Sequence, residues 1–209
     1  MKARLDALLA ATRVWRSVVD PVVTPHVPTG WPTLDAALGS VGWPLGSLIE
    51  LLLPAAGAGE LSLLLPALKT LTDTRELTTK RWLVCIAPPH VVYPPALLQA
   101  GIATEHLLLV DATAVNDRLW AIEQALRSGS CLAVLAWLDA VDDRWLRRIK
   151  RAAVDSTALV VLCRSVAQQT QPSPASLRLV LRPTPHGLDL HVIKRKALGA
   201  IWIRDVLSG

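Results

Sequence analysis

The turn within residues 50–60, ELLLPAAGAGE, has the position of a phosphate-binding loop, because apolar runs lie directly before and after its small residues. Phosphate loops follow the pattern G-x-x-x-x-G-K-[ST], in which backbone amides surround the phosphates, the lysine neutralises them and the hydroxyl group ligates Mg²⁺. If Gly59 is taken as the second glycine, Pro54 stands at the position of the first. Glu60 and Leu61 then stand at the lysine and hydroxyl positions. This register therefore supplies neither the cation nor the metal ligand.

The other register of this loop, with Gly57 as the second glycine, fails as well. The next two residues are then Ala58 and Gly59, and neither carries a charge or a hydroxyl group. The carboxylate of Glu60 would also repel a triphosphate at contact distance. We therefore predict that the loop binds no ATP, although the start of the following helix would attract anions weakly.

Other reactive side chains are scattered along the chain. Cys85, Cys131 and Cys163 each lie in an apolar run without a CxxC pair, so we expect buried thiols and no zinc site. The five histidines have no metal-ligand spacing, and no HExxH or GxSxG motif is present. Glu123, on an expected helix, is interpreted as a solvated carboxylate. The sequence thus predicts a protein without catalytic residues, metal or cofactor.

Positive charge is concentrated in the last third of the chain. Residues 140–209 hold 12 Lys and Arg against 5 Asp and Glu, whereas the whole chain has 22 against 17. Such asymmetry suits an anionic partner, either DNA or an acidic protein face, and the alternative is a solubilising surface. The candidate contact residues are Arg144, Arg147, Arg148 and Arg151 on one helical face, and Lys194, Arg195 and Lys196 at a strand end.

The first 19 residues have the pattern of an amphipathic helix, with charged side chains mostly off one apolar stripe. Four prolines follow within residues 20–32 and exclude a regular helix there. We therefore divide the chain into an N-terminal helix with a proline-rich linker, residues 1–27, and a core, residues 28–209. The helix would dock either on its own core or on a neighbour, including a second copy of the chain. Its expected anchors are Leu5, Leu8, Leu9 and Trp15.

The core alternates continuously apolar runs with helical patterns, which predicts an α/β fold with a mostly parallel sheet. The last three runs alternate polar and apolar residues across short turns, so we expect antiparallel strands at the C-terminus. The expected strands are 47–53, 81–87, 106–112, 131–137, 157–164, 177–183, 187–196 and 200–206, and the expected helices are 60–71, 94–102, 116–128 and 142–153.

No stretch has the roughly 20 uninterrupted apolar residues of a membrane span. The most apolar region, residues 48–68, contains Glu50, Glu60, two prolines and two glycines. The N-terminal segment also lacks the uninterrupted apolar core of a signal peptide. We therefore expect a cytoplasmic protein that does not enter a membrane.

Several motifs occur in the order found in a known family. The segment TGWPTLDAALGSVGWPLGSLIEL, residues 29–51, resembles the opening of the RecA core. The tryptophan-rich motifs GWP, GWPLG and LIELL, the turn APPH, RSGSCLAVLAW followed by LRRIKRAA, and PSPASLRLVL resemble the ImuA family of translesion DNA synthesis-associated proteins. This family belongs to the RecA-like superfamily and is grouped with the SulA cell-division inhibitors. The resemblance covers most of residues 28–196 and implies a three-layer RecA-like core.

The resemblance also locates two further catalytic positions, and both lack the catalytic residue. RecA ATPases carry a water-activating glutamate after the strand that matches WLVCIA, where this chain has Pro88, Pro89 and His90. They carry a Mg²⁺-linked aspartate at the end of the strand that matches residues 131–137, which here ends in Ala136 and Trp137. We interpret His90 as a turn residue and the later Asp139 as a cap of the following helix. The resemblance thus implies a protein without ATPase activity.

With catalysis excluded, the resemblance implies an adaptor. ImuA proteins are expected to act in the SOS-induced mutasome with ImuB, a Y-family polymerase relative, and with RecA and a DnaE-type polymerase. The basic residues would then contact a partner or DNA directly. The alternative is a SulA-like inhibitor of cell division that binds FtsZ.

Overall fold

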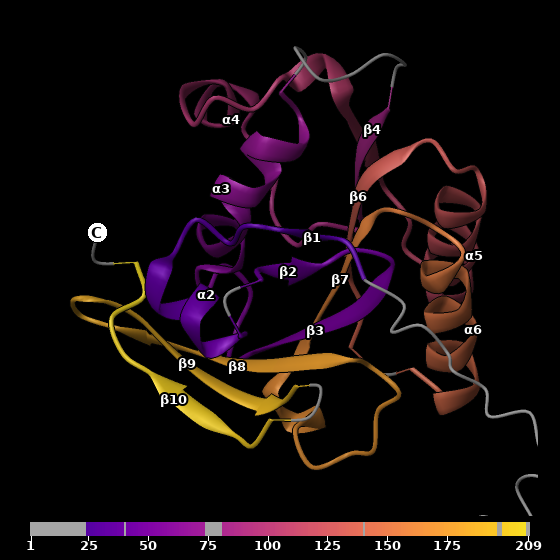
Figure 1. Cartoon of the computed structure of the whole chain (residues 1–209). Helices are drawn as coiled ribbons and strands as arrows, with labels where there is room; N and C mark the ends of the chain where they lie inside the picture. Colours follow the sequence, from indigo (N-terminus) through magenta and orange to yellow (C-terminus); the bar gives the residue numbers. More distant parts are fainter. Residues whose placement is uncertain (1–23, 40, 74–80, 140, 196–197, 208–209) are drawn as a thin grey trace, which may run out of the picture.

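An eight-stranded β-sheet with the order β10-β9-β8-β3-β7-β6-β4-β5 forms the centre of the protein (Figure 1). This computed structural model describes residues 24–39, 41–73, 81–139, 141–195 and 198–207. Neighbouring strands from β8 to β5 run parallel, and β9 and β10 are each antiparallel to the strand before. The strands are β3 (Ser47–Leu53), β4 (Trp82–Ile86), β5 (Leu107–Val110), β6 (Cys131–Trp137), β7 (Leu159–Ser165), β8 (Leu177–Thr184), β9 (Gly187–Lys194) and β10 (Ile201–Ile203).

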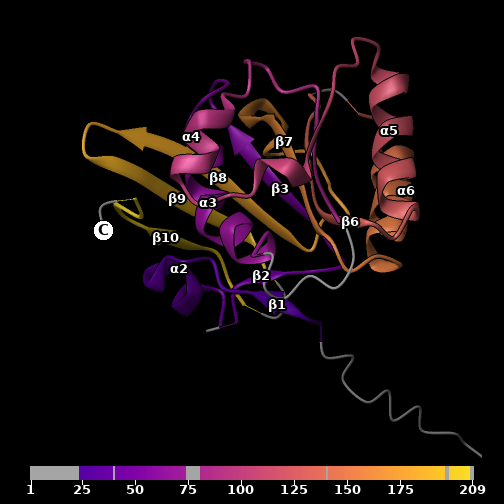
Figure 2. The ribbon, with the colours of Figure 1, turned by 90° about the horizontal axis from the view of Figure 1, so that it is seen from above.

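Helices cover both faces of the sheet, and each face has its own apolar cluster. One cluster is formed with α2 (Pro32–Ala37), α3 (Glu60–Leu71) and α4 (Pro94–Gln99). The other is formed with α5 (Val115–Arg127) and α6 (Asp143–Val154). Figures 1 and 2 show α5 and α6 together on one side of the central strands and the other three helices on the opposite side. The sheet is therefore the middle of three layers.

Strand β3 shows why the central strands consist mostly of apolar residues. Its side chains alternate between the faces, so Ile49 and Leu51 pack in the cluster of α2–α4 while Leu48 packs in the cluster of α5 and α6. All three side chains are fully buried. Burial of each stabilises the fold by about 1.5–3 kcal/mol. A strand covered on both faces consequently has no position for a solvated side chain.

The parallel strands bring their carboxyl ends to one edge of the sheet, where ligand sites of α/β proteins usually lie. The loop 54–59 joins β3 to α3 at this edge, and the loop 87–93 joins β4 to α4 there. The carboxyl ends of β6 and β7 lie beside them, because both strands pair in the same direction. The fold thus gathers at one edge every segment that the sequence marks as a possible nucleotide site.

The α/β class and the mostly parallel sheet are confirmed, and the bounds of β3, α3 and β6 are those expected. One correction concerns β8, which pairs parallel with β3 and antiparallel only with β9. Two features were not expected: the short helix α2, and the antiparallel ladder of β1 (His26–Val27) with β2 (Trp43–Pro44). The helix expected within residues 1–19 lies outside the described residues.

Candidate functional site

The loop 54–59 after β3 is hydrogen-bonded to the side chain of Glu60, the residue that follows the loop. Gly57 and Gly59 have φ angles of +75° and +97°, in the left-handed region that glycine adopts without strain. This backbone path turns the amide of Gly57 toward the first residue of α3, Glu60. Glu60 Oε1 accepts a hydrogen bond from Gly57 N–H at 3.1 Å. The backbone amide of Gly57, which a phosphate group would require, is therefore already bonded to a carboxylate.

Trp137, the last residue of β6, completes this arrangement. Its indole Nε1–H donates a hydrogen bond to the same oxygen, Glu60 Oε1, at 3.2 Å. Both residues are buried. Glu60 stands where a phosphate loop has its lysine, and Trp137 ends the strand that would carry the Mg²⁺-linked aspartate. These two residues are bonded directly to each other. A triphosphate would have to break the bond between Glu60 and Trp137 and would be repelled by the carboxylate of Glu60. The absence of ATP binding stays a prediction.

The other loops at this edge contain His90 and Asp139, which the sequence indicated as a turn residue and a helix cap. His90 lies close to the loop, because a Cβ atom added at Gly57 would stand 3.6 Å from His90 Nε2. The expectation that Asp139 caps the next helix is wrong. Asp139 Oδ1 accepts from Ser165 N–H at 3.1 Å, while Asp142 caps α6 by accepting from Arg144 N–H at 3.0 Å. The cap lies three residues later than expected because α6 begins only at Asp143.

An apolar pocket of about 330 Å³ opens between the start of α3, the loop 88–93 and α4. Leu61, Leu65, Val92 and Leu97 contribute apolar walls, and Glu60 and Trp137 also line it. Two large side chains of the lining are exposed at its rim: Val91 is 94% and Tyr93 67% accessible. Leu98, on α4 next to the lining residue Leu97, is 55% accessible. Exposed apolar side chains gathered around a pocket are typical of an interaction surface.

A second pocket of about 450 Å³ lies across the carboxyl ends of the five strands β3, β4, β5, β6 and β7. Arg118 and Arg164 line it together with Asp111 and Asp139, so its charged groups are balanced in sign. Arg118 is held in place because its Nε donates to Ala112 O at 2.7 Å. Pro88, Pro89 and Trp137 line both pockets.

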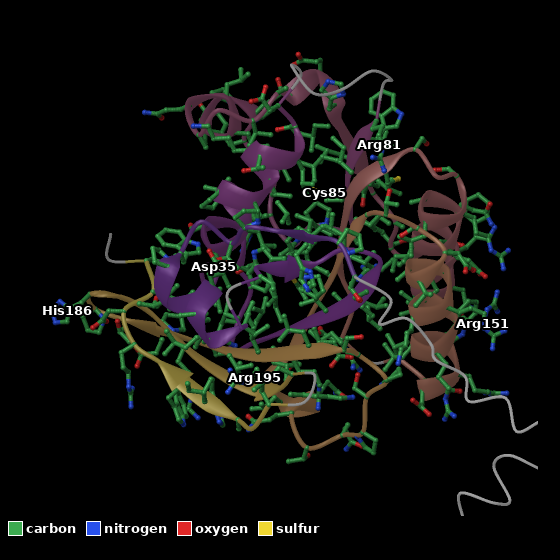
Figure 3. The ribbon with its side chains drawn as sticks, viewed as in Figure 1. Asp35, Arg81, Cys85, Arg151, His186 and Arg195 are labelled. Carbon is green, nitrogen blue, oxygen red and sulfur yellow. The ribbon has the colours of Figure 1, made fainter. Side chains whose placement is uncertain are left out.

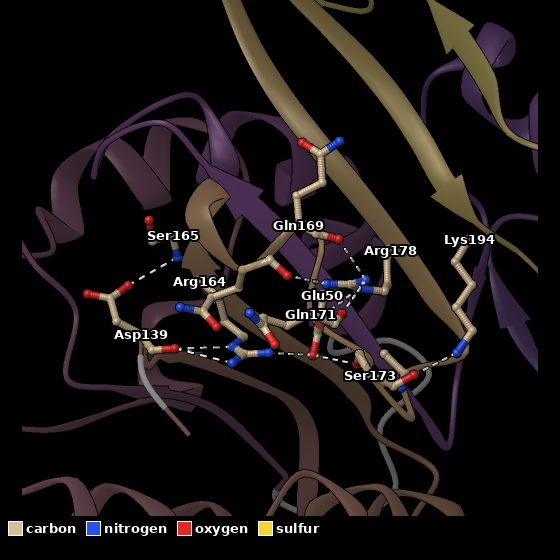
Figure 4. A network of polar contacts seen from close by, with 11 residues as sticks. Glu50, Asp139, Arg164, Ser165, Gln169, Gln171, Ser173, Arg178 and Lys194 are labelled. Atoms are coloured by element: carbon tan, nitrogen blue, oxygen red, sulfur yellow. Dashed lines mark hydrogen bonds and ion pairs between the residues drawn. The ribbon is translucent and has the colours of Figure 1, made fainter. Parts of the chain in front are cut away.

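Behind the second pocket lies a buried ion cluster that the sequence analysis missed (Figure 4). Glu50 is fully buried in β3, where it pairs with Arg164 at 3.0 Å and Arg178 at 2.8 Å. Ser173 Oγ donates to the same carboxylate at 2.7 Å. Arg178 also donates to three backbone carbonyls of residues 168–171. The cluster therefore ties the polar loop before β8 to the centre of the sheet.

The arginines of α6 are mostly engaged with acidic neighbours. Arg144 pairs with Asp142 at 3.1 Å, and Arg147 pairs with Asp143. Arg148 lies over Trp145 at 4.1 Å from its ring centre. The side chain of Arg151 is exposed and has no ion pair or hydrogen bond among the described residues. Most of the charge on this helix face is thus already compensated.

Glu123 is a correction, because the sequence indicated a solvated carboxylate. The residue is buried, and its carboxylate pairs with Arg127 at 2.8 Å and with Arg148 at 2.6 Å. Two arginines on the solvent side of α5 and α6 therefore cover it. An amphipathic pattern alone cannot reveal this arrangement, because the partner of Glu123 on α6 is 25 positions away.

The described basic residues at the end of β9 donate to backbone carbonyls. Lys194 Nζ donates to Ser173 O at 2.8 Å, and Arg195 donates to the carbonyls of Gly199 and Ala37. Figure 3 shows Arg151 and Arg195 in separate regions of the molecule. Lys196 and the anchors expected on the N-terminal helix (Leu5, Leu8, Leu9 and Trp15) lie outside the described residues.

The three cysteines are buried, as the sequence predicts. Burial raises the pKa of the Cys85 thiol to about 12 and that of Cys163 well above its usual range. Such thiols remain protonated and unreactive at neutral pH. Within the described ranges, no helix is long and apolar enough to cross a membrane.

A family model described as "Cell division inhibitor SulA" matches residues 54–160, which contain the loop, Glu60, the pocket and Trp137. The chain belongs to the SulA family. A relative named "Cell division inhibitor SulA" from Pseudomonas aeruginosa is 33% identical over 93 residues, or 44% of this chain and 56% of the relative. One of the same name from Edwardsiella piscicida is 30% identical over 127 residues, or 60% of this chain and 68% of the relative.

These matches correct the main functional expectation from the sequence. The chain was expected to be an ImuA-type adaptor of translesion synthesis, and that expectation is wrong, because the matching family and both relatives are cell-division inhibitors. The SulA relationship, given as the alternative, is supported. The match to the Pseudomonas protein spans little more than half of that relative.

Proposed function

We propose that this SulA-family protein inhibits cell division by binding FtsZ through the pocket and rim between α3 and α4. The observation that carries the proposal is the family match over residues 54–160, because this segment contains the whole of that surface. Both similar relatives are named as cell-division inhibitors. The protein would act in the cytoplasm during the SOS response.

The rim has the composition that interfaces use. Tyr93 and Val91 expose large side chains next to a concave apolar pocket, and aromatic residues dominate the binding energy of many interfaces. The described face of α6, in contrast, has most of its arginines paired with neighbouring carboxylates. Contact with a protein partner through the rim is therefore favoured over contact with DNA through α6.

The inhibitor would work as a binding protein without nucleotide chemistry. The order strand, glycine turn, helix is that of phosphate-loop proteins, which supports a RecA-like origin of the core. Glu60 and Trp137 nevertheless bond to one another where the catalytic groups would stand. Binding of FtsZ is therefore expected to need neither ATP nor Mg²⁺ on this chain.

Expression in dividing bacteria tests the proposed function. Cells that produce the wild-type chain should grow as filaments, and cells that produce Tyr93→Ala at the same level should divide more normally. Trp120→Ala is a matched control, because Trp120 is an equally exposed aromatic residue on α5, outside the rim. Normal division in cells that contain folded wild-type protein would refute the proposal.

A further inference from the structure

The carboxylate of Glu60 is only half used by its neighbours. Oε1 accepts from both Gly57 N–H and Trp137 Nε1–H, whereas Oε2 is buried without a hydrogen-bond partner among the described residues. Glu60 as a whole is 3% accessible. Buried carboxylate oxygens are nearly always hydrogen-bonded, because loss of water from an unpaired charged group is costly. The unpartnered Oε2 therefore marks a place where a donor is missing.

Glu60 belongs to the lining of the apolar pocket between α3 and α4. Around it stand the apolar walls of Leu61, Leu65, Val92 and Leu97. Among the lining residues, Glu60 is the one carboxylate, and none is a lysine or arginine. The pocket volume of about 330 Å³ is at the small end of the range for ligand sites, so it suits a single side chain better than a nucleotide.

We propose that this pocket receives a lysine side chain of the protein partner, with the ammonium group donating to Glu60 Oε2. This proposal deepens the proposed function and rests on it for the identity of the partner, FtsZ. A lysine combines a long apolar stem with a terminal charge, and such side chains bury the stem along apolar surface. The apolar walls would cover the stem, and the carboxylate would neutralise the charge.

Lysine fits better than arginine because one carboxylate oxygen is already occupied. Arginine binds carboxylates most strongly through two parallel hydrogen bonds, which need both oxygens. Here Oε1 is held by Gly57 and Trp137, so Oε2 is the carboxylate oxygen without a hydrogen-bond partner among the described residues. A compact ammonium group requires no more than that.

The substitution Glu60→Gln tests the pairing with little disturbance of the fold. The glutamine carbonyl can still accept from Gly57 and Trp137, while its NH₂ group replaces the unpartnered oxygen. A donor would then face the ammonium group. Since removal of one member of a buried charge pair weakens binding strongly, we expect the Kd for FtsZ to rise at least about tenfold. The control is Glu105→Gln, which removes the same charge from an exposed position outside the pocket.

A small-molecule titration tests the pocket without FtsZ. The probe is n-pentylammonium, with 1-pentanol and n-pentylguanidinium as comparisons, and the signal is the indole N–H resonance of Trp137 in the full chain. This N–H contacts the carboxylate directly, and its resonance is assigned by its loss in Trp137→Phe. We expect the ammonium to shift this resonance more than either comparison does, and to shift it little in Glu60→Gln.

The outcomes separate this proposal from the proposed function. An unchanged Kd for FtsZ in Glu60→Gln would overturn the lysine site and leave FtsZ binding intact. An equal response to pentanol, or a larger response to the guanidinium, would overturn it as well. If the wild-type chain does not bind FtsZ, the proposed function fails, and the ammonium titration alone then decides whether the pocket is selective for an alkylammonium group.

Discussion

Trp137 Nε1 lies 3.2 Å from Glu60 Oε1, so the end of β6 is hydrogen-bonded to the first residue of α3 across the edge of the sheet. The two residues are 77 positions apart in the sequence. This bond and the one from Gly57 turn a loop of phosphate-binding type into a closed structural element. The amide of Gly57, which a phosphate group would need, is thus already bonded within the protein.

The first prediction concerns the stability that this bond provides. Trp137→Phe removes the donor and leaves the buried carboxylate with one hydrogen bond fewer. Since hydrogen bonds to charged groups contribute about 1.5–3 kcal/mol, we expect the free energy of unfolding to fall by about 2 kcal/mol. Urea denaturation measures the change. Trp120→Phe, at an exposed position of α5, should change it by less than about 0.5 kcal/mol, and equal losses in both variants would contradict the role of the bond.

The second prediction is that ATP does not bind. A ligand that binds only the folded state raises its stability, by about 2.7 kcal/mol at a hundredfold excess over Kd. We therefore expect the melting temperature to be the same with and without millimolar Mg-ATP. A rise in the melting temperature that depends on ATP concentration would contradict this prediction.

The third prediction concerns the buried ion cluster. Glu50→Gln leaves Arg164 and Arg178 buried without a counter-charge, and loss of one partner of a buried pair typically costs about 3–5 kcal/mol. We expect a loss of about 3 kcal/mol in urea denaturation. Asp143→Asn, which breaks an exposed pair with Arg147, should cost less than about 1 kcal/mol. A loss in Glu50→Gln as small as in this control would show that the backbone carbonyls around Arg178 suffice.

The fourth prediction is a pH dependence that arises at His191. Desolvation and the charge of Arg182 lower the pKa of this imidazole, which stacks on Trp202 with ring centres 4.2 Å apart. Because the folded state then binds the proton less readily than the unfolded state, stability should fall as the pH drops below the usual histidine value of 6.5. Stability curves from pH 7.5 to 5 should therefore slope more steeply in the wild type than in His191→Gln. Identical slopes would exclude this contribution.

The sequence alone predicted those elements that have a continuous local pattern. The run 131–137 is apolar at every position, and the run 47–53 is apolar except at Ser47 and Glu50, because both faces of these strands are covered. Such runs are visible without any structure. The helix α2 was missed because its six residues begin with a proline and are too few to show a period. The pairing of β8 with β3 was missed because an alternating pattern does not specify strand direction.

The candidate site was only partly predictable, because its contacts join residues that are far apart in the sequence. The sequence shows that Glu60 replaces a lysine, but not that Trp137 bonds to it. Glu50 is separated from Arg164 and Arg178 by 114 and 128 positions, so only the fold brings these charges together. A single acidic residue inside an apolar strand was the available signal, and two later strands that each contain an arginine were its possible partners.

The central claim is that this SulA-family protein binds FtsZ through the rim of the α3–α4 pocket without nucleotide. Titration of the purified full chain against purified FtsZ, with and without ATP, tests this claim most directly, with Tyr93→Ala and Trp120→Ala measured alongside. We predict saturable binding that ATP does not change, that Tyr93→Ala weakens about tenfold or more, and that Trp120→Ala leaves unaltered. Absence of binding by the folded wild-type chain, or equal binding by the Tyr93→Ala variant, would contradict it.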